Sequence, residues 1–136
     1  MKIVVGYVKT PEGEAAVDRA IAEARLRDAS LVIVHSSKGG SHEDVEEAVT
    51  YQDQLEEIDR RLAGQGVTHE VRQLTRGKDP VEDLIDVVHD SGAELIVIGL
   101  RRRTAVGKFV LGSNAQQILM DADCAVLCVK AKSGRK

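Results

Sequence analysis

The sequence predicts an α/β fold with three layers, in which helices cover both faces of a five-stranded parallel sheet. Short apolar segments recur along the 136 residues, and a segment with apolar residues at helical spacing follows each of them except the last. The apolar segments are rich in Val and Ile, which is typical of strands that are buried on both faces. Strands that alternate with helices form parallel sheets, because each helix carries the chain back to the start of the next strand.

Nine elements are predicted from these patterns, and local signals mark several of their ends. Ser41 and Asp44 can cap the second helix. Asp79 and Pro80 mark the start of the third helix, and Gly92 marks its end. The predicted strands span residues 2–8, 30–36, 67–74, 94–99 and 125–130, and the predicted helices span residues 12–28, 41–62, 80–91 and 113–121.

These elements fit a single domain over residues 1–130, which leaves a polar tail over residues 131–136. The chain is 43% hydrophobic and 30% charged but has only three aromatic residues, so Val, Ile, Leu and Ala must form its core. Its formal net charge of −3 and its few aromatic side chains argue against a protein that binds nucleic acid.

No apolar run approaches the length of about 20 residues that a membrane-spanning helix needs, and the N-terminal apolar segment is too short for a signal peptide. We therefore expect a cytoplasmic protein with no membrane partner. Cys124 and Cys128 lie in one predicted strand, where strand spacing puts them about 13 Å apart, too far for a disulfide or a shared metal ion. We expect both to act as small apolar side chains.

The segments that follow the first, second and fourth strands are expected at the carboxyl-terminal edge of the sheet, where open α/β sheets bind ligands. Gly112 and Ser113 open a helix there, and the unpaired N–H groups and partial positive charge of a helix start favour an anion. Gly99 and Gly112 would let a phosphate approach the backbone closely. The alternative at this point is that the glycines only turn the chain and that Ser113 only caps the helix.

Catalytic and metal-binding patterns are absent from the sequence. It contains neither GxxxxGK[ST] nor GxGxxG, and its histidines and cysteines do not have the spacing of a zinc site. Ser113 lacks the GxSxG turn and a recognisable base, so we do not expect a nucleophile there. His35 ends the second strand near the ligand edge, and we interpret it as a hydrogen-bonded histidine at the margin of the core.

The spacing of Gly99, Arg102, Gly112 and Ser113 resembles the G-x2-G-x9-G-[S/T] motif of the universal stress protein family, with Arg102 in place of the second glycine. The segments IVVGY, VIVH, GKDPVEDLI, ELIVIG, LGSNAQQIL and CAVLCV are similar to the family in the same order, so the resemblance covers about residues 2–130. It implies a sheet with the strand order 3-2-1-4-5.

The resemblance also implies a non-catalytic protein of the stress response that binds an adenine nucleotide, ATP or AMP, with Mg²⁺ accompanying ATP. Val8 stands where the family has an Asp that contacts adenine, and the backbone at Ser36 would also contact the base. The residues implied at the nucleotide site are Gly6, Tyr7, Val8, Ser36, Gly99, Leu100, Arg101, Arg102, Gly112, Ser113 and Asn114.

Two other functions remain open at this point. In the first, Val8 and Arg102 close the nucleotide site, and the protein is a ligand-free dimeric interaction module. In the second, the protein slowly hydrolyses ATP; an acidic side chain that positions water near the phosphates would favour this function, and the sequence identifies none.

A homodimer is expected through the last strand, Ala125–Lys130. This strand is apolar, lacks proline and lies at a sheet edge in the expected strand order. An exposed apolar edge promotes aggregation unless it is paired, and a two-fold pairing would cover it. Members of the family that this chain resembles dimerise through the same strand.

Overall fold

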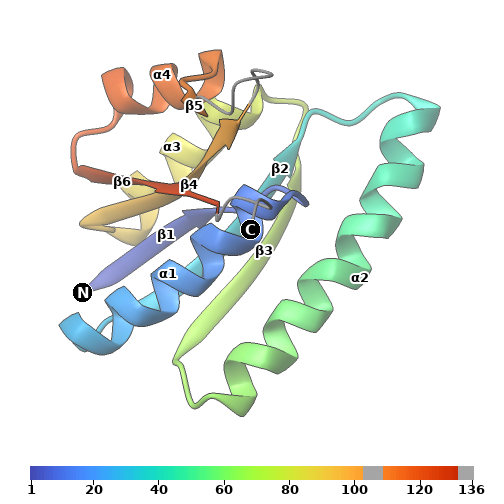
Figure 1. Cartoon of the computed structure of the whole chain (residues 1–136). Helices are drawn as coiled ribbons and strands as arrows, with labels where there is room; N and C mark the ends of the chain where they lie inside the picture. Colours follow the sequence, from blue (N-terminus) through green and yellow to red (C-terminus); the bar gives the residue numbers. More distant parts are fainter. Residues whose placement is uncertain (103–108, 132–136) are drawn as a thin grey trace.

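The structure is a computed structural model that describes residues 1–102 and 109–131, so the end of the predicted tail lies outside the described residues. The elements follow the predicted alternation of strands and helices, with one short strand added (Figure 1). They are β1 (Lys2–Gly6), α1 (Pro11–Arg27), β2 (Ser30–Ser37), α2 (His42–Gly64), β3 (His69–Thr75), α3 (Pro80–Ser91), β4 (Leu95–Arg102), β5 (Phe109–Val110), α4 (Ser113–Asp121) and β6 (Ala125–Lys130).

Five parallel strands form the sheet in the order β3-β2-β1-β4-β6, which confirms the predicted order because β6 is the fifth predicted strand. Val4 in β1 lies between Val32 of β2 and Ile96 of β4. The added strand β5 was not predicted from the sequence. It pairs antiparallel with the end of β4, with Arg101 opposite Val110.

Alternate residues of the strands pack into two apolar cores, one on each face of the sheet. Ile3 and Val5 belong to the core beneath α1 and α2, whereas Val4 belongs to the core beneath α3 and α4. All three side chains are fully buried. Figure 1 shows the two pairs of helices on opposite sides of the sheet, which is the predicted three-layer arrangement.

The starts of the helices that face the ligand edge differ in how they are capped. The Thr10 side chain accepts a hydrogen bond from the Gly13 N–H at the start of α1, and Asp79 accepts from Val81 N–H at the start of α3. The predicted capping role of Ser113 was wrong. The chain is still extended at Gly112, so Gly112 is the N-cap, Ser113 is the first helical residue, and α4 has no side-chain cap.

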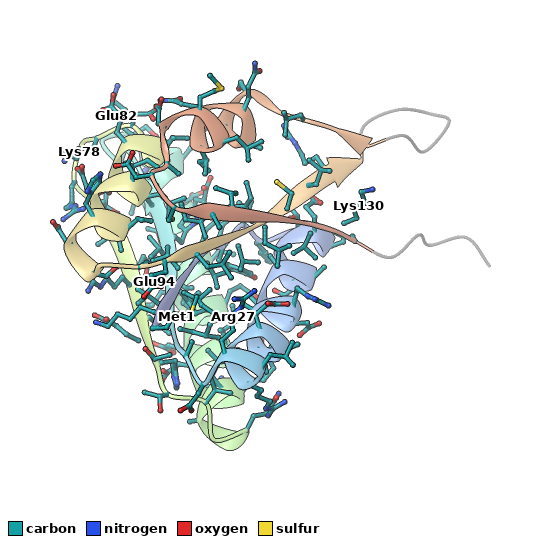
Figure 2. All side chains as sticks on the ribbon, turned by 90° about the vertical axis from the view of Figure 1, so that its left-hand side faces the viewer. Met1, Arg27, Lys78, Glu82, Glu94 and Lys130 are labelled. Carbon is teal, nitrogen blue, oxygen red and sulfur yellow. The ribbon has the colours of Figure 1, made fainter. Side chains whose placement is uncertain are left out.

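The β6 strand forms an edge of the sheet, since it pairs with β4 alone among the described strands. Figure 2 looks onto this edge and shows β6 in front, with Lys130 near its carboxyl end. Cys124 and Cys128 are free, and both pack against the core beneath α3 and α4, as expected for small apolar residues. None of the helices in the described residues is long and apolar enough to cross a membrane.

Candidate functional site

Two adjoining pockets form one cleft at the carboxyl-terminal edge of the sheet. The first, of about 300 Å³, lies between the ends of β1 and β2 and the helices α2 and α3, and we call it the ring pocket. The second, of about 230 Å³, lies between the starts of α1 and α4, and we call it the helix-start pocket. The residues that line both pockets are Gly6, Val8, Gly99, Asn114 and Ala115.

Three aromatic rings stack against one another beside the ring pocket. The His35 and Tyr51 rings are nearly parallel, with centroids 3.4 Å apart, and Tyr7 meets Tyr51 edge-on at 6.1 Å. Tyr51 also accepts a hydrogen bond of 3.0 Å from the Lys9 N–H, which ties α2 to the segment that follows β1. Both tyrosines of the chain therefore belong to this aromatic cluster beside the ring pocket, and both are buried.

His35 is held as a neutral imidazole. Its Nδ1 lies 3.0 Å from the Tyr7 carbonyl oxygen, which can only accept, so Nδ1 carries the proton. Burial lowers the pKa of His35, and the hydrogen bond to Tyr7 only partly opposes this effect. Its Nε2 is buried without a hydrogen-bond partner among the described residues. The structure thus confirms a hydrogen-bonded histidine at the margin of the core.

Ser36 is part of a buried polar cluster at the end of β2. Its hydroxyl donates a hydrogen bond of 2.7 Å to Asp83, whose other carboxylate oxygen accepts from Arg76 Nε at 2.8 Å. Burial by itself would raise the pKa of Asp83, but the hydrogen bonds from Arg76 and Ser36 outweigh it and hold that pKa below its usual value. Since the Ser36 hydroxyl is already engaged, its backbone is the part left for a ligand.

The helix-start pocket has the features of an anion site. Gly112, Ser113 and Asn114 begin α4, whose first N–H groups have no side-chain cap. A Cβ placed on Gly112 would meet no atom within 4 Å, so the backbone there is open to an approaching group. Arg101 also lines this pocket, is exposed, and makes no ion pair within the described part of the chain. These features concentrate positive charge at one rim of the cleft.

Gly99 also has a packing role that its sequence position did not indicate. A Cβ at Gly99 would lie 2.4 Å from the Glu12 carbonyl oxygen and 2.6 Å from its carbonyl carbon. Gly13 is still tighter, since its Cβ would lie 1.7 Å from the Val8 carbonyl oxygen. These glycines let the first turn of α1 pack directly on the ends of β1 and β4. The space on the side-chain side of Gly99 is therefore filled by the backbone of α1, whereas its own backbone still lines both pockets.

Apart from Arg102, every residue predicted at the site lines the cleft. Val8, expected as a residue that could close the site, is half exposed and lines both pockets, which remain open beside it. The side chain of Arg102 lies outside the described residues. The predicted residues that line the cleft are Gly6, Tyr7, Val8, Ser36, Gly99, Leu100, Arg101, Gly112, Ser113 and Asn114.

Several residues that reach the cleft from the helices were not predicted from the sequence. Glu47 and Tyr51 of α2 line the ring pocket, and Thr10, Glu12 and Gly13 at the start of α1 line the helix-start pocket. Thr10 just before Pro11 is a readable cap signal, so the start of α1 could have been placed at this edge. The residues of α2 carry no such signal, because their position depends on how that helix packs.

A resident metal ion has no ready-made site in the described residues, where no cluster of three or more His, Cys, Asp or Glu side chains occurs. Glu12 contributes the one carboxylate among the residues that line the helix-start pocket. A single carboxylate is enough for Mg²⁺ when ligand phosphates and water supply the other oxygens. The donor set therefore fits a cation that arrives with a phosphorylated ligand.

Comparisons with known proteins agree on one family. The sequence matches the universal stress protein family over residues 1–130. A universal stress protein of Mycolicibacterium smegmatis is 39% identical over 94% of this chain and 96% of its own. The solved universal stress protein of Archaeoglobus fulgidus has a TM-score of 0.79 at 33% identity, over 95% of this chain and 97% of its own.

A second structure from Archaeoglobus fulgidus shows the universal stress protein in complex with dAMP. It matches with a TM-score of 0.74 at 31% identity, and the match covers 95% of this chain and 96% of that one. The resemblance read from the glycine motif and the flanking strand segments thus holds at the level of both sequence and fold. This chain is a member of the universal stress protein family.

Proposed function

We propose that this protein is a non-catalytic, cytoplasmic homodimer of the stress response that binds an adenine nucleotide, ATP or AMP, in the cleft. The observation that carries the proposal is the junction of the two pockets, which joins an anion-attracting helix start to a hollow walled by aromatic rings. The similar Archaeoglobus fulgidus protein in complex with dAMP supports an adenine nucleotide as the ligand.

The helix-start pocket suits the phosphates. The N–H groups of Gly112, Ser113 and Asn114 can donate to phosphate oxygens, and the open space at Gly112 lets these oxygens come close. The Ser113 hydroxyl is free of a capping bond and can donate as well. Arg101 can add a charge-assisted hydrogen bond at the rim. If the ligand is ATP, the ATP phosphates and the Glu12 carboxylate would bind Mg²⁺ together.

The ring pocket suits the adenine. Its volume of about 300 Å³ is at the lower end of the range for small-molecule sites, and Val8 offers the base an apolar surface. Backbone groups at the end of β2 supply the hydrogen bonds, since the Ser36 hydroxyl is engaged with Asp83. The open cleft beside Val8 favours this proposal over a ligand-free module.

The proposal of a binding protein, and not an enzyme, rests on the roles that the polar side chains already have. The His35 Nδ1 proton is committed to the Tyr7 carbonyl, and the unpaired Nε2 is buried. Ser113 has no base within hydrogen-bond distance among the described residues. A nucleophile without a base to activate it is a weak one. We assign Glu12, the acid that lines the helix-start pocket, to the cation that accompanies ATP and not to an attacking water.

Calorimetric titration with AMP and ATP tests the ligand. We expect the wild-type protein to bind at micromolar concentration and Gly112→Val to weaken binding at least about tenfold, because the side chain fills the space that the phosphates need. Gly64→Val is the matched control, since a Cβ there also meets open space but lies far from the cleft. Equal affinity in the two variants, or no binding by the wild type, would disprove the proposal.

We propose that the dimer forms through β6. Val126, Leu127, Cys128 and Val129 are each partly exposed on this edge strand, and its unpaired N–H and C=O groups can form a ladder with a second copy.

Light scattering should give twice the mass of 14.7 kDa for the wild type. It should give the single mass for Val129→Lys, because the new charge would be buried without a partner in the proposed interface. Val49→Lys, on the exposed face of α2, should stay dimeric. A monomeric wild type would rule out this interface.

A further inference from the structure

The helix-start pocket contains one acidic side chain, to which the proposed function assigns only a part in holding Mg²⁺ when ATP is the ligand. Glu12 lies in the first turn of α1 and lines the pocket together with Arg101, Gly112 and Ser113. A carboxylate in a pocket that attracts anions is unexpected, because it repels the ligand that the α4 start favours. Its position therefore needs a reason beyond the shape of the cleft.

The packing of α1 fixes where the Glu12 side chain begins. A Cβ at Gly99 would lie 2.9 Å from the Glu12 Cβ, so this side chain starts against the end of β4. The close approach of Gly13 to the Val8 carbonyl fixes the next residue of the helix as well. Glu12 cannot leave the pocket by a small shift of the helix, because the backbone contacts on both sides prevent it.

The other acid in the same turn shows what an ordinary first-turn Glu does here. Glu14 accepts a hydrogen bond of 2.5 Å from the Tyr7 hydroxyl and lies 3.5 Å from Arg61, outside the cleft. Glu12 has no ion pair and no side-chain hydrogen bond within residues 1–102 and 109–131, and it is partly buried. Favourable interaction with the α1 helix dipole accounts for an acid in the turn, but not for one that lines the pocket.

We infer that Glu12 makes the choice of nucleotide depend on a divalent cation. This inference rests on the proposed function. A triphosphate brings about twice the charge of a monophosphate into the pocket, so Glu12 disfavours it more strongly when no metal is present. A Mg²⁺ ion that binds phosphate oxygens and the Glu12 carboxylate together removes the repulsion and adds two attractive contacts. Without the cation the site prefers AMP, and with it the site accepts ATP.

The test is a set of titrations with AMP and with ATP, each in EDTA and in Mg²⁺. For the wild type, Mg²⁺ should tighten ATP binding at least about tenfold and change AMP binding less than about threefold. In Glu12→Gln, ATP should bind more tightly in EDTA than it binds to the wild type in EDTA, because the repulsion is gone. The metal effect should fall below about threefold, because the ion has lost its protein ligand. Asp18→Asn is the matched control, because it removes the same charge from an exposed position of α1 and should keep the wild-type metal effect.

A second measurement reports the ligands of the metal ion directly. With ATP and the protein in excess, the electron paramagnetic resonance spectrum of Mn²⁺ should differ between the wild type and Glu12→Gln, because the Glu12 carboxylate replaces a water ligand of the ion. Identical spectra would overturn the inference.

The outcomes separate this inference from the proposed function. If the metal effect on ATP is the same in Glu12→Gln as in the wild type, Glu12 does not set the nucleotide preference, although AMP binding would still support a nucleotide site. If neither nucleotide binds under any condition, both the site and the role of Glu12 are wrong. Tight binding of ATP to the wild type in EDTA would also overturn the inference.

Discussion

The two glycines that frame the glycine motif differ in what surrounds them. Gly99 is part of a wall, in which the backbones of β4 and α1 touch and no side chain fits between them. Gly112 is part of a rim, where the backbone is open and a side chain would meet nothing within 4 Å. One glycine is needed for folding, whereas the other leaves room for a ligand. The glycines of one motif can therefore meet two unrelated physical requirements.

The largest expected effect on the free energy of unfolding is at Gly99, in the wall. Gly99→Ala should lower the free energy of unfolding by about 2–4 kcal/mol, because the new Cβ overlaps a backbone carbonyl that cannot rotate away. Gly112→Ala should change it by less than about 0.5 kcal/mol, since Ala adopts the φ of −67° found there without strain. Urea unfolding of both variants measures the difference. Similar losses of unfolding free energy in the two variants would show that Gly99 and Gly112 are not packed differently.

A second, smaller effect on the free energy of unfolding is expected in the polar cluster at the end of β2. Asp83→Asn should destabilise the protein at pH 7 by about 1–3 kcal/mol, because the hydrogen bonds from Arg76 and Ser36 lose their charged acceptor.

The same cluster also predicts a pH dependence. The pKa of Asp83 is lower in the folded protein than in the unfolded chain, so the ionised form stabilises the fold above about pH 4. This stabilisation is lost as the pH falls below that value. Unfolding curves from pH 7 to pH 3 should show a steeper loss for the wild type than for Asp83→Asn. Parallel curves would mean that Asp83 contributes no pH dependence.

Much of the fold could be predicted from the sequence because its signals are local. Buried parallel strands are short apolar runs, and Asp79 with Pro80 marks a helix start that the structure confirms. The cap of α4 was misplaced by one residue, since Gly112 and Ser113 are both acceptable caps in sequence. The strand β5 has only two residues and gave no pattern that periodicity could detect.

The site was predicted less completely, for a physical reason. The glycine motif located the rim and the strand ends, but the remaining lining residues depend on contacts between distant segments. Tyr51 reaches the ring pocket only because α2 packs across the end of β2, where its ring stacks on His35. The role of Gly99 likewise depends on how closely α1 approaches β4. Neither distance is encoded in the residues next to these positions.

The smallest expected effect, on stability and on AMP affinity, is at Val8, which lines both pockets. Its side chain is 50% exposed, so Val8→Asp should leave the free energy of unfolding within about 0.5 kcal/mol of the wild type. The new carboxylate can accept a hydrogen bond from the exocyclic amine of adenine. One such bond is worth about 1 kcal/mol, or about a fivefold tighter AMP complex.

Inosine monophosphate is the control for Val8→Asp, because it carries an oxygen in place of that amine and cannot donate there. If titrations show a gain for AMP and none for inosine monophosphate, the base lies in the ring pocket with its amine toward residue 8. An equal gain for both would mean that the carboxylate acts through something other than the amine. No gain for either would mean that the base lies elsewhere in the cleft, and that the apolar Val8 marks a site with a different orientation of the ligand.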